Sequence, residues 1–260
     1  ADEIAVALHA AKNAGAPVTI IGNGSNLLVR DGGIRGLVLR ISGGLNAIRR
    51  EGDCLLVQAG ASLAAVAAFA RDEGLSGMAE LGGIPGTVGG GVYMNAGAYG
   101  AELAQLVTQA EGVSLSDGRR VIYPADRLDF AYRHSALMDA GVVITQATLA
   151  LTPGDPEAIR ARMEECAKAR REKQPLTLPS AGSTFKRPEG HFAAKLIDDC
   201  GLRGLTVGGA QVSEKHAGFI VNIGGATARD MLELMRQVEQ RVFEQTGVQL
   251  EPEVRILGED

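Results

Sequence analysis

The sequence predicts an α+β protein, in which helices and short strands follow one another along the chain. Apolar residues recur three and four positions apart after Thr227, which is typical of an amphipathic helix. Apolar and polar residues alternate over 142–151, as they do in a strand. Glycine accounts for 35 of the 260 residues, against an average share of about 7%, and the excess lies in a few loops. At this length the chain can bury one large core or two to three small ones.

In the first half of the chain, short strands surround two helices. The first helix is expected over 2–14, with Asp2 as its N-cap and Gly15 at its C-terminal end. Ser62 caps the second helix, which is expected over 62–71. The strands expected in this half are 18–21, 37–41, 54–58, 107–115 and 121–123.

The helices of the second half begin at recognisable N-terminal signals. Asp155 and Pro156 are the N-cap and first residue of a helix that ends in basic residues. Thr227 and Asp230 resemble a capping box. Prolines within 174–180 mark a linker, and we expect a domain boundary there. The further elements expected are a helix over 191–200 and strands over 142–151, 218–223 and 249–257.

The composition excludes several classes of protein. A net charge of −5, an aromatic content of 4% and the lack of tryptophan argue against a nucleic-acid partner. No stretch approaches the ~20 apolar residues of a membrane span, so no membrane partner is expected. The histidines and cysteines show no metal-ligand spacing, and we expect no metal site. We expect Cys54, Cys166 and Cys200 to be free, mostly buried thiols of a cytoplasmic protein.

Two glycine-rich segments carry the strongest functional signal. Eight of the twenty residues of 81–100 are glycine, and the loop 22–26 reads Gly-Asn-Gly-Ser-Asn. A backbone without Cβ atoms can present several N–H groups to one anion, so we interpret 22–26 and 86–90 as cradles for a pyrophosphate. The alternative is a set of turns between strands. The chain lacks the GxxxxGK(S/T) motif of a P-loop, and Leu27 replaces the third glycine of GxGxxG. A dinucleotide or flavin dinucleotide fits best.

Three side chains outside these segments are candidates for chemistry. Ser183 lies on a loop without a GxSxG elbow, so a serine hydrolase is poorly supported, and a capping or solvated hydroxyl is the alternative. Arg133 is either a partner for a carboxylate or phosphate, or a surface arginine. Glu253 shares a strand face with Glu251 and Arg255, which indicates either a ligand-facing carboxylate or a cross-strand ion pair.

Six motifs occur in the order in which one enzyme family carries them: GNGSNLL, PGTVGGGVYMNAGAYG, FAYRHS, AGSTFKRP, SEKHAGFIVN and LEPEVRILGE. Over nearly its whole length the chain therefore resembles the UDP-N-acetylenolpyruvoylglucosamine reductases, the MurB family. Its compact 93–98 region is similar to the smaller, type II form of these enzymes. The GSTFKRP and EPEVR pieces make the resemblance specific, because other flavoproteins of the vanillyl-alcohol-oxidase type share the glycine-rich loops.

The resemblance implies a vanillyl-alcohol-oxidase/PCMH-type FAD-binding domain of two α+β subdomains, followed by an α+β substrate-binding domain. It places the first subdomain at 1–45 and the second at 46–173, with 248–260 returning to the second. The substrate-binding domain is expected at 174–247. In the family a further segment precedes the opening helix, so we expect residue 1 to correspond to a point inside the first subdomain.

The resemblance also implies a reaction. Non-covalently bound FAD would take a hydride from NADPH and pass it to UDP-N-acetylglucosamine enolpyruvate, giving UDP-N-acetylmuramate for peptidoglycan synthesis. Ser183 would donate the proton, while Arg133 and Glu253 would polarise the substrate carboxylate. The residues expected to bind FAD are Gly22, Asn23, Gly24, Ser25, Asn26, Leu27, Gly86, Thr87, Val88, Gly89, Gly90, Asn95, Gly97 and Ala98.

A UDP-sugar bound by a net-acidic protein needs local positive charge. The residues expected at that end of the substrate are Lys186, Lys195, Arg203, His216 and Asn222. Two alternatives remain open, namely another FAD-dependent oxidase of the same fold and a catalytically inactive flavin-binding domain. The sequence leaves the oligomeric state open.

Overall fold

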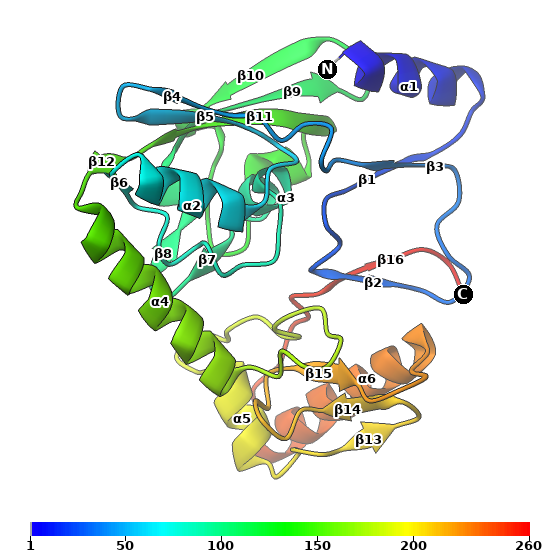
Figure 1. Cartoon of the computed structure of the whole chain (residues 1–260). Helices are drawn as coiled ribbons and strands as arrows, with labels where there is room; N and C mark the ends of the chain where they lie inside the picture. The colour runs from blue at the N-terminus through cyan, green and yellow to red at the C-terminus, as the bar shows by residue number, and fades with distance from the viewer. Residues whose placement is uncertain (1) are drawn as a thin grey trace. The chain divides into compact units, whose positions relative to one another are not determined.

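The computed structural model describes residues 2–260, which fold into two compact units. Unit 1 contains the residues up to Asn23 together with Gly36–Lys168, and unit 2 contains Gly24–Arg35 together with Ala169–Asp260. Figure 1 shows the elements in chain order. Each unit has its own hydrophobic core. None of the helices within residues 2–260 is long and apolar enough to cross a membrane.

A five-stranded antiparallel sheet forms the centre of unit 1. Its strands follow the order β10 (Arg120–Pro124), β9 (Val107–Ser114), β11 (Val142–Ala150), β5 (Cys54–Gln58) and β4 (Ile48–Glu51). Helices α2 (Leu63–Asp72) and α3 (Val88–Tyr93) lie on the same face of this sheet (Figure 1). Side chains alternate along β5, so Leu55 and Val57 are completely buried.

The other elements of unit 1 are mostly short. A first helix, α1 (Asp2–Asn13), precedes β1 (Val18–Ile21), which pairs in parallel with β3 (Leu37–Arg40). Two short antiparallel pairs join β6 (Leu75–Ser76) to β12 (Thr152–Pro153) and β7 (Gly97–Ala98) to β8 (Ala101–Glu102). Single 3-10 turns span Leu103–Gln105, Ala125–Arg127 and Ala136–Met138. The long helix α4 (Pro156–Lys173) begins in unit 1 and ends in unit 2.

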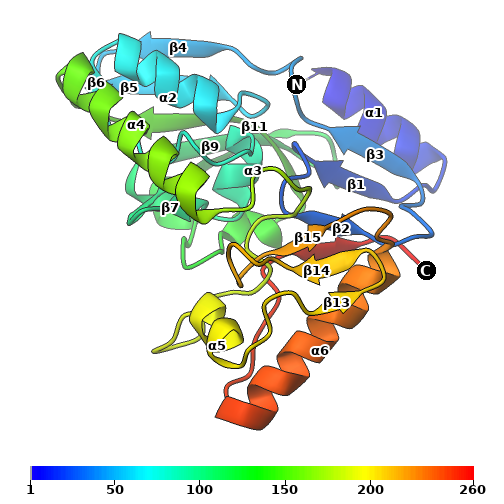
Figure 2. The same ribbon diagram turned by 60° about the horizontal axis from the view of Figure 1, so that its bottom comes forward.

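Unit 2 is built on a three-stranded antiparallel sheet, in which β14 (Ala210–Val212) lies between β13 (Thr206–Val207) and β15 (Ile220–Asn222). Helix α6 (Ala228–Thr246) packs along one face of this sheet, and α5 (Ala193–Asp199) contacts α6 (Figure 2). The apolar stripe of α6 includes Leu234, Val238 and Val242, all completely buried. β2 (Leu27–Val29) pairs in parallel with β16 (Arg255–Leu257), which joins Gly24–Arg35 to the end of the chain.

The capping signals of three helices are confirmed. Ser62 accepts an amide hydrogen bond of 3.1 Å in the first turn of α2, and Asp155 accepts one of 3.2 Å in the first turn of α4. Thr227 and Asp230 form the expected capping box at α6. The prediction for the first helix needs a small correction, because Asp2 lies within α1 rather than ahead of it.

Several elements depart from the sequence prediction. The glycine-rich stretch contains α3, because the lack of a side chain at Gly89 lets this helix lie against Ala59, whose Cβ would be 2.9 Å from a Cβ at Gly89. The last strand is restricted to β16, and Pro252, which has no amide hydrogen, lies within the part expected to be strand. β4 was not expected, and the helix expected over 191–200 is the shorter α5.

The three-part division of the chain stays a prediction. The compact units group the residues differently, since 174–247 and 248–260 both belong to unit 2. β16 pairs with β2, which the sequence assigned to the first subdomain, and not with a strand of 46–173.

Asp31 closes the N-terminus of α6 from a distant part of the sequence. Its carboxylate accepts the amides of Ala228 at 2.7 Å and Arg229 at 3.0 Å. Together with the capping box, these bonds satisfy the amide groups that an α-helix leaves unpaired in its first turn. They also connect the segment after β2 to α6.

Asp31→Ala is expected to lower the free energy of unfolding by about 1 to 2 kcal/mol, because it removes two charge-assisted bonds at the positive end of the helix dipole. Asp31→Asn keeps one acceptor oxygen and is expected to lose less. Urea unfolding measures both variants, and an Asp31→Ala protein as stable as the parent would contradict this role.

Candidate active site

The first glycine-rich loop follows β1 and keeps its amide groups available. The amides of Asn23, Gly24 and Ser25 donate no hydrogen bond to other residues of the described chain 2–260. Gly24 has a φ of +70°, a backbone conformation that favours glycine. A Cβ at Gly22 would lie 2.6 Å from Thr87 Oγ1, so only glycine allows this loop to approach the second glycine-rich segment so closely.

The second segment offers fewer donors than the sequence suggested. The amides of Val88 and Gly89 donate to the carbonyls of Ala61 and Ala59, each at 2.8 Å. The Gly90 amide points to Thr87 Oγ1 at 3.4 Å, as part of the N-cap of α3. Within the described residues the amides of Gly86 and Thr87 have no such acceptor. An anion cradle here is therefore restricted to those two amides, since the next three hold α3 in place.

Two more residues expected at the cofactor lie in the same stretch. Asn95 is completely buried, with its side chain bonded to backbone groups of the protein. Gly97 begins β7, and a Cβ there would lie 2.8 Å from the Ala101 carbonyl, so glycine permits the tight pairing of β7 with β8. Their neighbour Ala98 is half-buried. For Asn95 and Gly97 the structure thus shows roles within the fold.

Ser183 lies exposed on a segment that is fixed by its neighbour Thr184. Thr184 is buried, its amide donates to the Gly218 carbonyl at 2.9 Å, and its Oγ1 accepts the Ile220 amide at 3.0 Å. The Thr184 carbonyl accepts the Glu253 amide at 2.8 Å. Ser183 therefore directly precedes the residue whose carbonyl accepts the backbone amide of Glu253.

Within unit 2, the end of the first glycine-rich loop is hydrogen-bonded to the segment that carries Glu253. Asn26 Nδ2 donates to the Glu253 carbonyl at 3.0 Å, and the Arg255 amide donates to the Asn26 carbonyl at 3.0 Å. The sequence placed Glu251 and Glu253 on one strand, but the strand begins only at Arg255. Glu251 instead forms an ion pair with Lys186 at 3.1 Å. Residues 24–26, 183–186 and 251–255 thus come together although they are far apart in sequence.

A pocket of about 220 Å³ adjoins these segments. Its walls are mainly apolar, with Leu28, Met231 and Met235 among them. Ala181 and Thr184, which flank the Ser183 loop, and Val254, which follows Glu253, also line it. The pocket can receive a flat or apolar group next to the candidate proton donor. Its complete lining is Leu27, Leu28, Pro179, Ser180, Ala181, Thr184, Ile220, Asn222, Met231, Met235 and Val254.

Arg133 belongs to unit 1, whereas Ser183 and Glu253 belong to unit 2. Its φ of +54° is unusual for a residue with a Cβ. The guanidinium carbon lies 5.2 Å from the centroid of the Tyr132 ring, and Nη2 donates to the Gly97 carbonyl at 3.4 Å. A strained, half-buried arginine held against the glycine-rich stretch suits the binding of a carboxylate.

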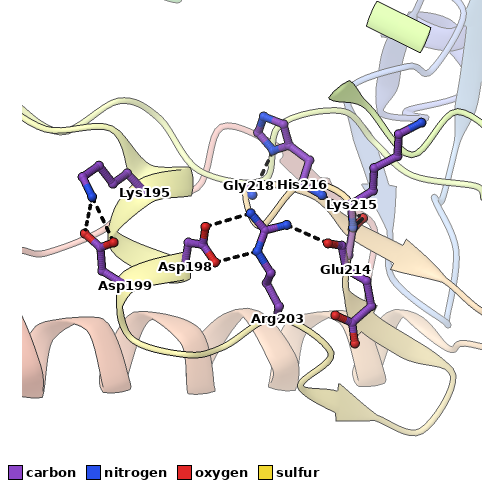
Figure 3. Close-up of polar contacts among 9 residues, drawn as sticks. Lys195, Asp198, Asp199, Arg203, Glu214, Lys215, His216 and Gly218 are labelled. Atoms are coloured by element: carbon purple, nitrogen blue, oxygen red, sulfur yellow. Dashed lines mark hydrogen bonds and ion pairs between the residues drawn. The ribbon is translucent and has the colours of Figure 1, made fainter. Parts of the chain in front are cut away.

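The positive residues expected at the UDP end have acidic partners. Lys195 pairs with Asp199 at 2.8 Å, and Arg203 makes two hydrogen bonds to Asp198, at 2.5 and 2.8 Å, as Figure 3 shows. These bonds raise the pKa of Lys195 and lower the pKa of Asp198. Lys186 is likewise paired, with Glu251. The local charge is therefore closer to neutral than the sequence suggested.

The other two residues expected there have structural bonds of their own. His216 Nδ1 accepts the Gly218 amide at 3.1 Å, and the ring packs edge-on against Phe219 (Figure 3 shows the bond). Burial, followed by the nearby Arg203 charge, lowers the pKa of His216. The Asn222 side chain accepts the amides of Gly224 and Ala226 and so closes the turn after β15.

The expected thiols and histidines are placed as follows. All three cysteines are free, as predicted, but only Cys166 is buried, while Cys54 and Cys200 are half-buried. Residues 2–260 contain no group of three or more histidine, cysteine or acidic side chains suited to hold a metal ion.

Comparisons with known proteins agree with the geometry. Residues 1–122 match the model of an FAD binding domain, and residues 174–257 match the C-terminal domain of UDP-N-acetylenolpyruvoylglucosamine reductase. The UDP-N-acetylenolpyruvoylglucosamine reductase of Pediococcus pentosaceus is 50% identical, across 96% of this chain and 83% of its own length. That of Agathobacter rectalis is 50% identical across 97% and 84%. The crystal structure of the Thermus caldophilus enzyme (MurB) matches with a TM-score of 0.82 and 40% identity, across 95% of this chain and 88% of its own.

The chain belongs to the UDP-N-acetylenolpyruvoylglucosamine reductase family. Membership confirms the predicted α+β fold class with its FAD-binding domain, and it confirms an FAD-dependent oxidoreductase that uses NADPH. It also favours the reductase over the oxidase and the inactive flavin-binding domain. The roles of the individual site residues stay predictions.

The loop 22–26 fits the cofactor of a MurB-family enzyme. Its available amides can bind a pyrophosphate, and the missing Cβ at Gly22 leaves room for the Thr87 side chain of the second segment. The residues present therefore fit FAD, with the first loop contributing more donors than the second.

The lowered pKa of His216 makes the stability of the folded protein sensitive to acid. The unfolded chain takes up a proton near the ordinary histidine pKa of about 6.5, whereas the folded protein does so only at lower pH. Stability is therefore retained above about pH 6.5 and falls as the pH drops below this value toward the folded pKa.

Between about pH 7.5 and pH 5.5, the melting temperature of the parent is expected to fall more than that of His216→Gln, which cannot take up this proton. Thermal unfolding at both pH values measures the difference. An equal fall in the two proteins would show that His216 does not contribute to acid sensitivity.

Proposed function

We propose that this protein reduces UDP-N-acetylglucosamine enolpyruvate to UDP-N-acetylmuramate with NADPH, in the synthesis of peptidoglycan precursors. The observation that carries the proposal is the meeting of three segments in unit 2. The backbone of Glu253 bonds both to the Asn26 side chain of the glycine-rich loop and to the carbonyl of Thr184, the residue after Ser183, next to one pocket. Cofactor loop, proton donor and carboxylate are the parts that this reaction needs.

The residues proposed to hold FAD are those of 22–27 and 86–90, whereas Asn95 and Gly97 have roles within the fold. When bound, FAD supplies the redox chemistry, in which a hydride from NADPH is passed to the terminal carbon of the enolpyruvyl double bond. Asn23, Gly24 and Ser25 offer amides to the pyrophosphate, and Gly86 and Thr87 offer two more. The contribution of the protein is to bind and orient, and to handle the proton.

Ser183 is proposed as the proton donor. Addition of hydride leaves negative charge on the carbon next to the substrate carboxylate, and this carbon then takes the proton of Ser183 Oγ. A serine is a weak acid, but such a carbanion is far more basic, so a well-aligned donor suffices. Because Ser183 is exposed while Thr184 is fixed on both sides, the hydroxyl can regain its proton from solvent without moving the backbone.

Arg133 and Glu253 are proposed to act on the substrate carboxylate. The guanidinium can make two parallel hydrogen bonds to it and so stabilise the negative charge that grows as hydride is added. Glu253 is proposed to support the same charge through a hydrogen bond of its carboxyl group. Both groups then act on the transition state more than on the ground state.

The UDP end of the substrate is proposed to bind at Lys186, Lys195, Arg203, His216 and Asn222. Because the three positive residues are ion-paired, a diphosphate has to compete with Glu251, Asp199 and Asp198 for them. All three pairs are largely exposed, and such pairs are weak enough to exchange partners. We also propose a cytoplasmic location, in keeping with the three free cysteines.

Gly22→Ala is expected to weaken FAD binding by about tenfold or more, which corresponds to about 1.4 kcal/mol. The added Cβ would lie 2.6 Å from Thr87 Oγ1, and the hydroxyl can move only by giving up its capping bond to Gly90. Gly43→Ala is the matched control, because a Cβ there meets no atom within 4 Å. Fluorescence titration of the apoprotein with FAD measures both. Unchanged affinity in Gly22→Ala would exclude the loop from the cofactor site.

Ser183→Ala is expected to leave the reduction of FAD by NADPH nearly unchanged, while its reoxidation by the enolpyruvyl substrate slows by about 10² to 10⁴-fold. Thr177→Ala, which removes an exposed hydroxyl from the preceding linker, is expected to change neither rate. Anaerobic stopped-flow absorbance follows the two half-reactions separately. Loss of both together would indicate a structural role for Ser183, and full reoxidation would remove it from the reaction.

A further inference from the structure

The turn that carries Arg133 is short and strained. The amides and carbonyls of Ala131 and His134 bond to each other, at 3.2 and 3.1 Å, which leaves Tyr132 and Arg133 at the tip. Arg133 has a φ of +54°, in the left-handed region that residues with a Cβ rarely adopt. Strained backbone of this kind persists only where surrounding contacts enforce it. The contacts that enforce it here come from the glycine-rich stretch.

Asn95 makes one of these contacts. It is completely buried, and its Nδ2 donates to the Ala131 carbonyl at 3.0 Å, directly at the base of the turn. Its Oδ1 accepts the Ala104 amide at 2.9 Å, so both ends of the side chain are bonded. Asn95 itself has a φ of +47°, which asparagine tolerates better than most residues. The side chain is thus a rigid link between the segment at 95 and the turn.

Ser135 makes the second contact, on the other side of the turn. It is also completely buried, and its Oγ donates to the Tyr93 carbonyl at 2.7 Å. The turn is therefore tied at both ends to residues 93–95, while Arg133 contacts the Gly97 carbonyl from its tip. A buried polar group that loses its partner is costly, so these two bonds fix the position of the turn firmly.

We propose that Asn95 is a positioning residue. Its side-chain amide fixes the position of the turn that carries Arg133, and thereby the geometry with which Arg133 binds the substrate carboxylate. The proposal rests on the proposed role of Arg133. Asn95 acts through the Ala131 carbonyl and contacts no reacting group. A misplacement of about 1 Å in such a clamp can cost on the order of 10² in rate, so a single bond of this kind matters for turnover.

Asn95→Asp tests the bond with little change of shape. It keeps the acceptor for the Ala104 amide and the tolerance for positive φ, but it replaces the donor toward Ala131 with an oxygen. The variant is combined with Arg133→Ala in a double-mutant cycle, with substrate-driven reoxidation of the reduced flavin as the rate. In the parent background Asn95→Asp is expected to slow this rate about tenfold or more, while NADPH-driven reduction stays nearly constant. In the Arg133→Ala background the same change is expected to cost less than about twofold.

Hydrogen exchange gives a readout that does not need the reaction. The His134 amide, which closes the turn, is expected to exchange faster in Asn95→Asp than in the parent, with or without FAD. An equal loss of rate in both backgrounds, or unchanged exchange, would show that Asn95 only supports the fold. If Asn95→Asp does not fold, Ser135→Ala removes the other tether and completes the same cycle.

Failure of the proposed function would look different. The parent protein itself would then show no reoxidation by the enolpyruvyl substrate. Failure of the proposed role of Arg133 would instead leave the reoxidation rate of Arg133→Ala unchanged, whatever Asn95→Asp does. If Arg133→Ala slows reoxidation but Asn95→Asp does not, the role of Arg133 stands and the positioning role of Asn95 is overturned.

Discussion

The arrangement of the candidate site in unit 2 depends on the hydrogen bonds of Thr184. Its amide, carbonyl and hydroxyl bond to Gly218, Glu253 and Ile220, and the residue is almost entirely buried. A buried backbone group without a partner costs about as much as a lost hydrogen bond, so all three segments must keep this register. Ser183 can therefore be exposed and still occupy a defined position, because its neighbour allows the backbone little freedom.

Elements with local chemical signals could be predicted from the sequence. The N-termini of α2, α4 and α6 follow from serine, aspartate and threonine caps, whose bonds span only two or three residues. Helix α3 could not be predicted from a local signal, because three of its six residues are glycine, which disfavours helices. It forms through contacts with Ala59 and Ala61 on another segment. Its N-cap, Thr87, was recognised only as part of an anion cradle.

Residues for the candidate site could be proposed from the sequence, but the electrostatics around them could not. Ser183, Glu253 and Arg133 were named from motifs, whereas the charge near Lys195 and Arg203 was judged from composition. The i,i+4 spacing of Lys195 and Asp199 on a helix could have indicated the first ion pair. The pair of Arg203 with Asp198 depends on the turn after α5, which no local pattern reveals. Net charge of a whole chain thus says little about the field at one site.

Buried polar side chains connect these observations. Within residues 2–260 they are Thr87, Asn95, Ser135, Thr184 and Ser213. Each adjoins a segment of the candidate site: Thr87 the cofactor loop, Asn95 and Ser135 the Arg133 turn, Thr184 the Ser183 segment, and Ser213 the turn that carries His216. Burying a polar side chain is unfavourable unless its bonds are satisfied, and an apolar residue of similar size would stabilise a core more simply. All five occur at segments of the candidate site, where their bonds hold the backbone in place. The sequence named two of the five, Thr87 and Asn95, but as cofactor ligands, and their role in holding the backbone was missed because it depends on contacts that are distant in sequence.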